Sequence, residues 1–353
     1  MKKIALSLVT LASLSFAGGD LTTPTTTKML APSTHSGVTV KSKAGVLKFS
    51  GEQRFSYSVS DQDQYDVGSF NVDRSYFQVK AYFFEDPKSY ARVTLDAKNF
   101  DDGAYDVYIK YSYLYLNNIL PDTGVELGQV HKPWIDYEEH YGFTKQAVYG
   151  VFTDKLHLTS SADRGVNFKT KLDNFSSEVG VFQGEGYKDV PDNANAGVSL
   201  EARLTYHLFG TKNKKEYFNI SLAGVHNNAH NEIATGPDGD LDWVLLHTAY
   251  KNSDYLIAGQ YLNVLKNETD ASTDEKGYGY SFNGEYYLND DYSVFARYDY
   301  WERDYDDQEK TNTVAGVAYK YNKNLTFLLS DIQKTKTGSE DENIVQALAW
   351  IKW

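Results

Sequence analysis

Apolar and polar residues alternate along several stretches of this chain. The longest covers residues 46–60, where the odd positions are apolar apart from Gly51 and Gln53 and the even positions from Lys48 onward are polar. Successive side chains of a β-strand point to opposite faces, so this alternation predicts a strand with one apolar and one polar face. The same pattern recurs in residues 90–99, 104–116 and 198–208. The longest stretch exceeds the usual strand of a soluble sheet.

The faces of individual strands are not equally clear. In residues 104–116 a single apolar face is predicted along the whole length, formed by the odd positions Tyr105, Val107, Ile109, Tyr111, Tyr113 and Tyr115. Residues 180–184, 241–250 and 325–332 are apolar at odd and even positions alike, so alternation does not assign their faces.

Short and long links alternate between the predicted strands. Seven short links lie near residues 85–88, 117–124, 173–174, 210–216, 251–254, 289–291 and 322–324. Eight longer polar links are centred on residues 61–68, 101–103, 132–163, 185–196, 227–240, 263–276, 303–310 and 333–342. This order predicts sixteen strands with both termini on the short-turn side, although fourteen or eighteen strands also fit the pattern. Short turns at one rim and long loops at the other are typical of bacterial outer-membrane β-barrels.

We therefore expect an all-β fold, a transmembrane antiparallel up-and-down β-barrel over residues 46–353. Residues 1–17 have two lysines, an apolar stretch and a small-residue end, which predicts a secretory signal peptide. Residues 18–45, rich in Thr and Ser, are predicted to be a flexible periplasmic segment. No stretch of the sequence approaches the roughly 20 apolar residues of a spanning helix. The expected location is the outer membrane of a Gram-negative bacterium.

Composition narrows the function classes. The chain has no Cys, which excludes disulfides, thiol nucleophiles and thiolate metal sites. The formal net charge of −13 argues against a nucleic-acid partner. The 29 Tyr residues favour strands that face both water and an apolar phase. No phosphate-binding loop, zinc signature or GxSxG motif occurs, and the cluster of Glu138, Glu139 and His140 with His131 lacks metal-ligand spacing. We expect no enzyme activity, metal or cofactor.

Basic residues are predicted on the inner faces of the strands. A charge on the lipid face costs a few kcal/mol near the midplane, so inward placement is expected. The predicted pore-lining residues are Lys48, Arg54, Arg74, Lys80, Arg92, Lys98, Lys110, Arg164, Lys169, Arg203 and Arg297.

The longest link, residues 132–163, needs a role, because a structureless loop of that length is otherwise unusual. We expect it to fold into the lumen and narrow it, where a ring of charge would select ions. Its predicted constriction residues are Lys132, Trp134, Asp136, Glu138, Glu139, His140 and Lys145. The alternative is that the loop covers the outer rim.

The chain ends in ALAWIKW, which is predicted to be the last strand. Trp353, Ile351 and the preceding odd positions form an apolar face, with Trp350 and Lys352 on the other. A final strand ending in an aromatic residue resembles the signal that the barrel-assembly machinery recognises, carried here by Trp350, Ile351 and Trp353. Pairing with the first strand would remove both sheet edges.

Two segments resemble the phosphate-selective porin family (porin O/P type). Residues 128–134 read GQVHKPW, and residues 160–168 read SSADRGVNF. The matching residues are Gln129, Lys132, Pro133, Trp134, Arg164, Gly165 and Val166, whereas Val130 and His131 depart from the pattern. The resemblance implies a sixteen-stranded, usually trimeric porin with its third loop inside the lumen. The resemblance does not imply phosphate selectivity for this chain, because no dense arginine ladder is found in the sequence. A Campylobacter-type major outer membrane porin or another general porin is a close alternative.

The sequence thus favours a porin, a water-filled channel through which small hydrophilic solutes and ions diffuse passively, with a mild anion preference. Outer-membrane lipid, the assembly machinery and two further copies of the chain are its expected partners. A non-conducting barrel that acts as an adhesin or surface scaffold is the main alternative. A soluble secreted β protein is the third.

Overall fold

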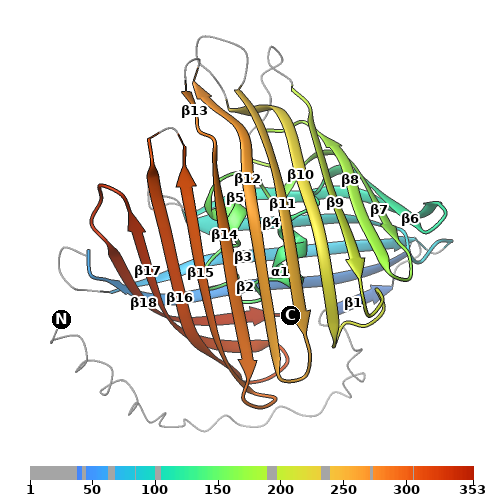
Figure 1. Ribbon diagram of the computed structural model, residues 1–353. Coiled ribbons are helices and arrows are strands. Elements are labelled where there is room, and N and C mark those ends of the chain that lie inside the picture. Colours follow the sequence, from blue (N-terminus) through green and yellow to red (C-terminus); the bar gives the residue numbers. More distant parts are fainter. Residues whose placement is uncertain are drawn as a thin grey trace, which may run out of the picture. The chain divides into compact units, whose positions relative to one another are not determined.

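One antiparallel sheet contains all the strands of the described residues (Figure 1). The computed structural model describes residues 38–41, 45–62, 68–83, 85–99, 105–188, 197–231, 239–270, 273–304 and 306–353. The predicted signal peptide and most of the predicted periplasmic segment lie outside these residues.

Sixteen long strands of the described residues close into a barrel, as predicted. They are β2 (Gly45–Ser60), β3 (Ser69–Phe83), β4 (Tyr90–Asn99), β5 (Tyr105–Leu120), β6 (Thr123–His131), β7 (Ala162–Lys171), β8 (Phe175–Phe182), β9 (Ser199–His207), β10 (Tyr217–Asn231), β11 (Gly239–Lys251), β12 (Tyr255–Asp270), β14 (Gly277–Tyr287), β15 (Tyr292–Arg303), β16 (Gln308–Lys320), β17 (Leu325–Lys336) and β18 (Glu342–Lys352). Each pairs with the next, and β18 pairs with β2 to close the sheet. Two short strands, β1 (Val38–Lys41) and β13 (Thr273–Asp274), add to β2 and β12.

The links between strands follow the predicted order of short and long. Turns of residues 121–122, 172–174 and 252–254 are among the short links at one rim, and residues 132–161 form the longest link at the other. This third loop carries two helices, α1 (Ile135–Tyr141) and α2 (Phe152–Lys155). Neither described helix is long and apolar enough to cross a membrane.

The outward face of the barrel is apolar and the inward face is largely polar, as β9 shows. Leu200, Leu204 and Tyr206 are 49%, 43% and 51% exposed, whereas Glu201 and Arg203 between them are buried. A soluble sheet would bury the apolar face, so this pattern suits a barrel whose outer surface meets lipid.

The predicted face of β5 is wrong beyond Ile109. Leu95 opposes Ile109 and Thr94 opposes Tyr111, so Lys110 is an extra residue in a β-bulge. The inserted residue shifts the alternation by one position. Ile109 is therefore 53% exposed on the outside, while Tyr111 is 6% exposed on the inside. Tyr113 and Tyr115 follow Tyr111 inward, because they oppose Arg92 and Tyr90 on β4.

Strands that are apolar on both faces pack against the third loop. On β11, Trp243 and Leu245 point inward and share a buried cluster with Trp134 and Phe152 of the loop. Leu328 on β17 belongs to a second cluster that contains Phe143, Ala147, Val148 and Tyr149 of the loop. The third loop therefore buries the inner apolar faces of these strands. Alternation within one strand does not reveal such a partner.

The seam of the barrel involves β1 as well as β18. The backbone of Trp353 exchanges two hydrogen bonds with Gly51, at 2.8 and 3.0 Å. On the N-terminal side of Gly51, β1 pairs with residues 46–49 of β2. The edge of β2 is thus covered first by β18 and then by β1, which lies at the end of the predicted periplasmic segment.

Candidate functional site

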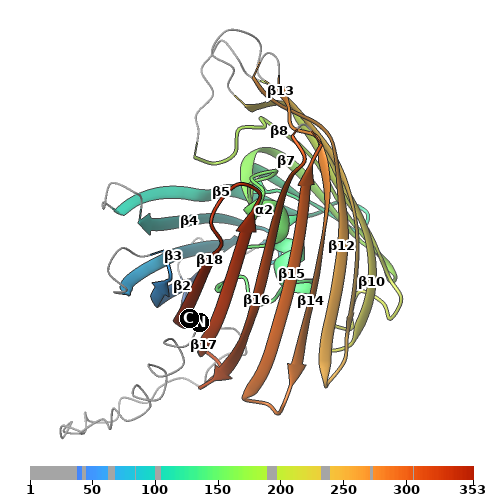
Figure 2. The same ribbon diagram turned by 60° about the vertical axis from the view of Figure 1, so that its left-hand side comes forward.

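The third loop lies against the inner face of the sheet (Figure 2). Trp134 is 2% and Phe152 is 1% exposed, and both pack on inward residues of β10 to β12 such as Trp243 and Leu262. This apolar contact attaches the loop to one side of the barrel. It is the kind of burial that removes large aromatic surfaces from water.

Polar contacts extend the attachment from β9 to β16. These contacts join Lys132 Nζ to Glu201 (2.5 Å), Arg203 Nε to the carbonyl of Pro133 (3.1 Å), Lys145 Nζ to Glu285 (2.5 Å), Arg297 Nη1 to the carbonyl of Gly150 (2.9 Å) and Tyr149 Oη to Asn312 (2.9 Å). Four residues predicted as pore-lining or constricting, namely Lys132, Lys145, Arg203 and Arg297, therefore bind the loop to the wall.

Glu138 is a buried part of this attachment. It is 2% exposed. Its carboxylate accepts hydrogen bonds from Trp134 Nε1 (2.9 Å), the Phe152 amide (3.2 Å) and Gln260 Nε2 (2.7 Å). Burial raises the pKa of Glu138, and Arg297 with these donors offsets only part of the rise. This residue, predicted to narrow the lumen by its charge, joins α1 to β12 instead.

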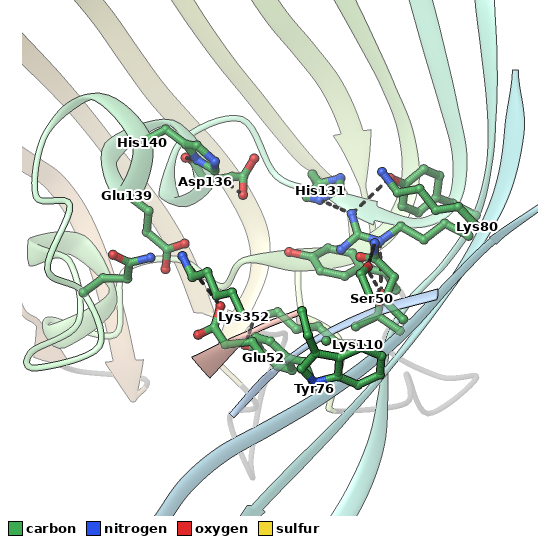
Figure 3. A pocket seen from close by; sticks show the side chains of 18 of the residues that line it. Ser50, Glu52, Tyr76, Lys80, Lys110, His131, Asp136, Glu139, His140 and Lys352 are labelled. Carbon is green, nitrogen blue, oxygen red and sulfur yellow. Dashed lines mark hydrogen bonds and ion pairs between the residues drawn. The ribbon is translucent and has the colours of Figure 1, made fainter. Parts of the chain in front are cut away.

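The neighbouring acids of α1 face open space. Glu139, Asp136 and His140 line a cavity of about 690 Å³, which we call the main cavity (Figure 3). The side chains of Asp136 and His140 are 48% and 67% exposed. His140 Nδ1 lies 2.6 Å from the carbonyl oxygen of Asp136, one helical turn earlier. These three residues are the part of α1 that lines the main cavity.

The opposite side of the main cavity is built by β2 to β7 and the end of β18. Its basic residues are Arg54, Lys80, Arg92, Lys110, Lys169 and Lys352. Its acidic residues, including those of α1, are Glu52, Glu126, Asp136 and Glu139. Figure 3 shows Lys80 and Lys110 across the cavity from Glu139 and Asp136. A basic wall thus faces an acidic helix.

Two further cavities adjoin the main one. A cavity of about 420 Å³ shares Lys110 and Glu139 with it and reaches Tyr187 in the long link between β8 and β9. A cavity of about 310 Å³ shares Asp136 and Lys169 with it and reaches Thr211 in the short link between β9 and β10. The hollow space therefore extends toward both rims.

Several inward bases are paired with carboxylates. The pairs are Arg54 with Glu52 (2.5 Å), Arg74 with Asp96 (3.5 Å), Lys169 with Glu126 (3.1 Å), Arg203 with Glu178 (3.0 Å) and Arg297 with Asp299 (2.7 Å). Their charges are largely compensated within the wall.

Other inward bases contact tyrosines instead. Lys110 Nζ donates to Tyr76 Oη at 2.6 Å. Lys80 Nζ lies 4.5 Å from the centre of the Tyr90 ring, and Arg92 Cζ lies 4.2 Å from that of Tyr111. These tyrosines were missed as candidates. For Tyr111 the run of tyrosines around Lys110 was the available signal, but the bulge hid its inward direction.

Arg164 does not line the lumen as predicted. It opposes Gln129 on β6 and shares a face with Phe168, which is 40% exposed on the outside. Arg164 and Lys169 are five positions apart, so a regular strand cannot point both inward. Lys169 is the inward one, bonded to Glu126. Lys48 lies on the inner face opposite Lys80, and the side chain of Lys98 lies outside the described part of the chain.

Comparisons with known proteins show likeness at the level of structure. No protein-family model and no curated protein matches the sequence. OmpT of Vibrio cholerae is similar at a TM-score of 0.66 and 14% identity over 90% of this chain and 100% of that one. The outer membrane channel DcaP of Acinetobacter baumannii gives 0.61 and 12% over 89% and 99%. A mutant of the Rh. blastica porin gives 0.53 and 12% over 87% and 100%. At these identities the likeness establishes the fold, and the chain has the sixteen-stranded barrel fold of outer-membrane proteins.

Proposed function

We propose that this protein is an outer-membrane porin through which small hydrophilic solutes and ions diffuse passively. The main cavity carries the proposal, because it is a hollow lined by charged side chains inside a barrel with an apolar outer face. Such an interior suits water and such an exterior suits lipid. The structural likeness to an outer membrane channel and to a porin supports it.

The third loop acts as the constriction. It occupies the side of the lumen lined by β9 to β17, so the remaining path runs along the inner face of β2 to β7. A solute on this path passes between Lys110 or Arg92 on the wall and Glu139 on α1. Charged groups at a constriction decide which ions pass easily.

A mild anion preference follows from the charges of the main cavity. Six bases and four acids line it, an excess of two positive charges. The ion pairs of Glu52 with Arg54 and of Glu126 with Lys169 cancel two charges of each sign, so the excess of two positive charges is unchanged by pairing. The negative net charge of the whole chain does not oppose this preference, because residues near the path dominate at physiological ionic strength.

The membrane context completes the proposal. Residues 1–17 direct export and are removed, and the assembly machinery recognises the final strand through Trp350, Ile351 and Trp353. The protein then works as a homotrimer in lipid. One of the similar structures, OmpT of Vibrio cholerae, is described in a trimer form. The resemblance of residues 128–134 to phosphate-selective porins stays at the level of a resemblance.

Planar-bilayer recording of the purified protein tests the proposal. We expect stepwise conductance increases and a reversal potential in a KCl gradient whose sign shows a modest chloride preference. Insertion without conductance would overturn the porin function and favour the non-conducting adhesin or scaffold. A reversal potential of the opposite sign would overturn the anion preference alone.

A further inference from the structure

Three inward bases stand in register on neighbouring strands. Lys48 on β2 opposes Lys80 on β3, and Lys80 opposes Arg92 on β4. We call these three residues the cationic row. Directly opposed residues of adjacent antiparallel strands lie about 4.5 to 5.5 Å apart at their Cα atoms. Like charges placed so are destabilising, so the row costs the sheet stability unless something compensates it.

No carboxylate of the described residues forms an ion pair with the row. In the described part of the chain, no carboxylate oxygen lies within 4.0 Å of the charged nitrogens of Lys48, Lys80 or Arg92. The bases Arg54 and Lys169, which line the same cavity, do have one. The row therefore differs from its neighbours on the same wall.

Arg92 is held in a fixed orientation at the end of the row. Its Nε donates to Thr94 Oγ1 (3.0 Å), and its Nη1 lies 2.9 Å from His131 Nε2. A guanidinium only donates hydrogen bonds, so His131 Nε2 is the acceptor and its Nδ1 carries the proton. That proton points to Glu126, 3.2 Å away. The chain of contacts leaves Nη2 of Arg92 without a hydrogen-bond partner among the described residues.

Tyrosine rings lie beside the row. Lys80 is placed over the ring of Tyr90 and Arg92 over that of Tyr111. Tyr113 Oη lies 3.4 Å from Tyr90 Oη, and it accepts a hydrogen bond from Arg92 Nη1 at 3.3 Å. Tyr90, Tyr111 and Tyr113 all line the main cavity with Lys80 and Arg92. The surface thus offers two cations with three tyrosine side chains beside them.

We propose that the cationic row is a subsite for small organic dicarboxylates. One carboxylate binds Lys80, the other binds Arg92, and the short carbon chain lies along the tyrosine rings. The arrangement favours an anion with two separated charges over a compact one, because the Lys80 side chain lies over Tyr90 whereas that of Arg92 turns the other way along β4, to Thr94 and the Tyr111 ring. Charge-assisted hydrogen bonds of this type are the stronger ones. This subsite rests on the proposed porin function and names the class of solute that it favours.

Current block by succinate in single-channel recordings tests the subsite. We expect succinate to interrupt the KCl current at lower concentration than acetate or sulfate. Lys80→Gln and Arg92→Gln should each raise the half-blocking succinate concentration about tenfold, the loss of one charge-assisted hydrogen bond. Lys352→Gln is the matched control, because it removes one positive charge from the same cavity outside the row. It should change the half-blocking concentration by less than about twofold.

The outcomes separate the two proposals. A wild-type protein that never conducts overturns the porin function. A conducting protein that succinate blocks no better than acetate overturns the subsite alone, as does an equal effect of Lys352→Gln and Lys80→Gln. Sulfate that blocks as well as succinate overturns the dicarboxylate class. Heat-dependent gel mobility of each variant shows that the barrel is folded, so a loss of block cannot be attributed to misfolding.

Discussion

Glu138 and Glu139 are consecutive residues of α1 that face opposite environments. Glu138 is 2% exposed and accepts three hydrogen bonds from the loop and β12. Glu139 lines the main cavity across from Lys110 (Figure 3). Neighbouring positions of a helix lie about 100° apart around its axis, so one can bind the wall while the next faces the path. Their charges therefore have separate roles.

Neutralising these two residues should give different results. Glu139→Gln removes a negative charge beside the path, so we expect the reversal potential to shift further toward chloride. Glu138→Gln should leave the reversal potential nearly unchanged and destabilise the loop by about 1–3 kcal/mol, because the amide cannot accept all three hydrogen bonds. Bilayer recording measures the first effect, and the frequency of brief closures measures the second. Equal shifts of reversal potential would contradict this division.

Ion selectivity should depend on pH through Glu139. Burial raises the pKa of Glu139, and Asp136 adds to the rise while Lys110 opposes it. As the pH falls from 7 toward 4, Glu139 takes up its proton earlier than an ordinary glutamate and its negative charge disappears. We expect the anion preference to increase over this interval. Glu139→Gln should flatten the dependence, and an unchanged slope in that variant would assign the effect to other groups.

Removing the main apolar anchor of the third loop should widen the channel. Trp134 is 2% exposed and packs with Trp243. Trp134→Ala should cost about 3–5 kcal/mol of packing. We expect a larger and noisier single-channel conductance as α1 leaves the wall. Phe70→Ala is the control, because Phe70 is 88% exposed and belongs to none of the buried clusters. A conductance equal to that of the wild type in Trp134→Ala would exclude the loop as the constriction.

The seam between β18 and β2 should be sensitive to a side chain at Gly51. A Cβ atom there would lie 2.5 Å from the ring of Trp353 and 2.6 Å from the backbone carbonyl oxygen of Tyr76, too close for both. Gly51→Val should therefore lower the yield of folded barrel more than it changes the conductance of molecules that do insert. Gly284→Val is the matched control, because its nearest neighbour is 3.7 Å away. Heat-dependent gel mobility of membrane fractions measures the yield, and equal yields would show that the close approach at Gly51 is not needed for assembly.

The sequence was sufficient for the sheet and its links. Alternation in residues 46–60 depends only on the period of a strand, and the order of short and long links predicted sixteen strands while leaving fourteen or eighteen open. The bulge at Lys110 was not readable, because its position is set by pairing with Leu95 and Thr94 on the next strand. The inward direction of Tyr111 was lost with it.

The candidate site was only partly readable. Inward bases such as Lys80 and Arg92 follow from avoidance of lipid, whereas their partners depend on register across strands. Arg203 and Lys145 could not be recognised as loop anchors, since the contacts join segments far apart in the sequence. The different roles of Glu138 and Glu139 depend on the rotation of α1, which short helices do not reveal by their pattern.

The inner faces of β10 to β12 also limit how the channel can change shape. Leu241, Trp243 and Leu245 are each at most 1% exposed while the third loop covers them. If the loop moved out of the lumen, these apolar side chains would be exposed to water, which is unfavourable. Wholesale withdrawal of the loop is therefore opposed by hydration of the barrel itself. We therefore expect the width of the proposed passage to change by local movements of α1 rather than by withdrawal of the whole loop.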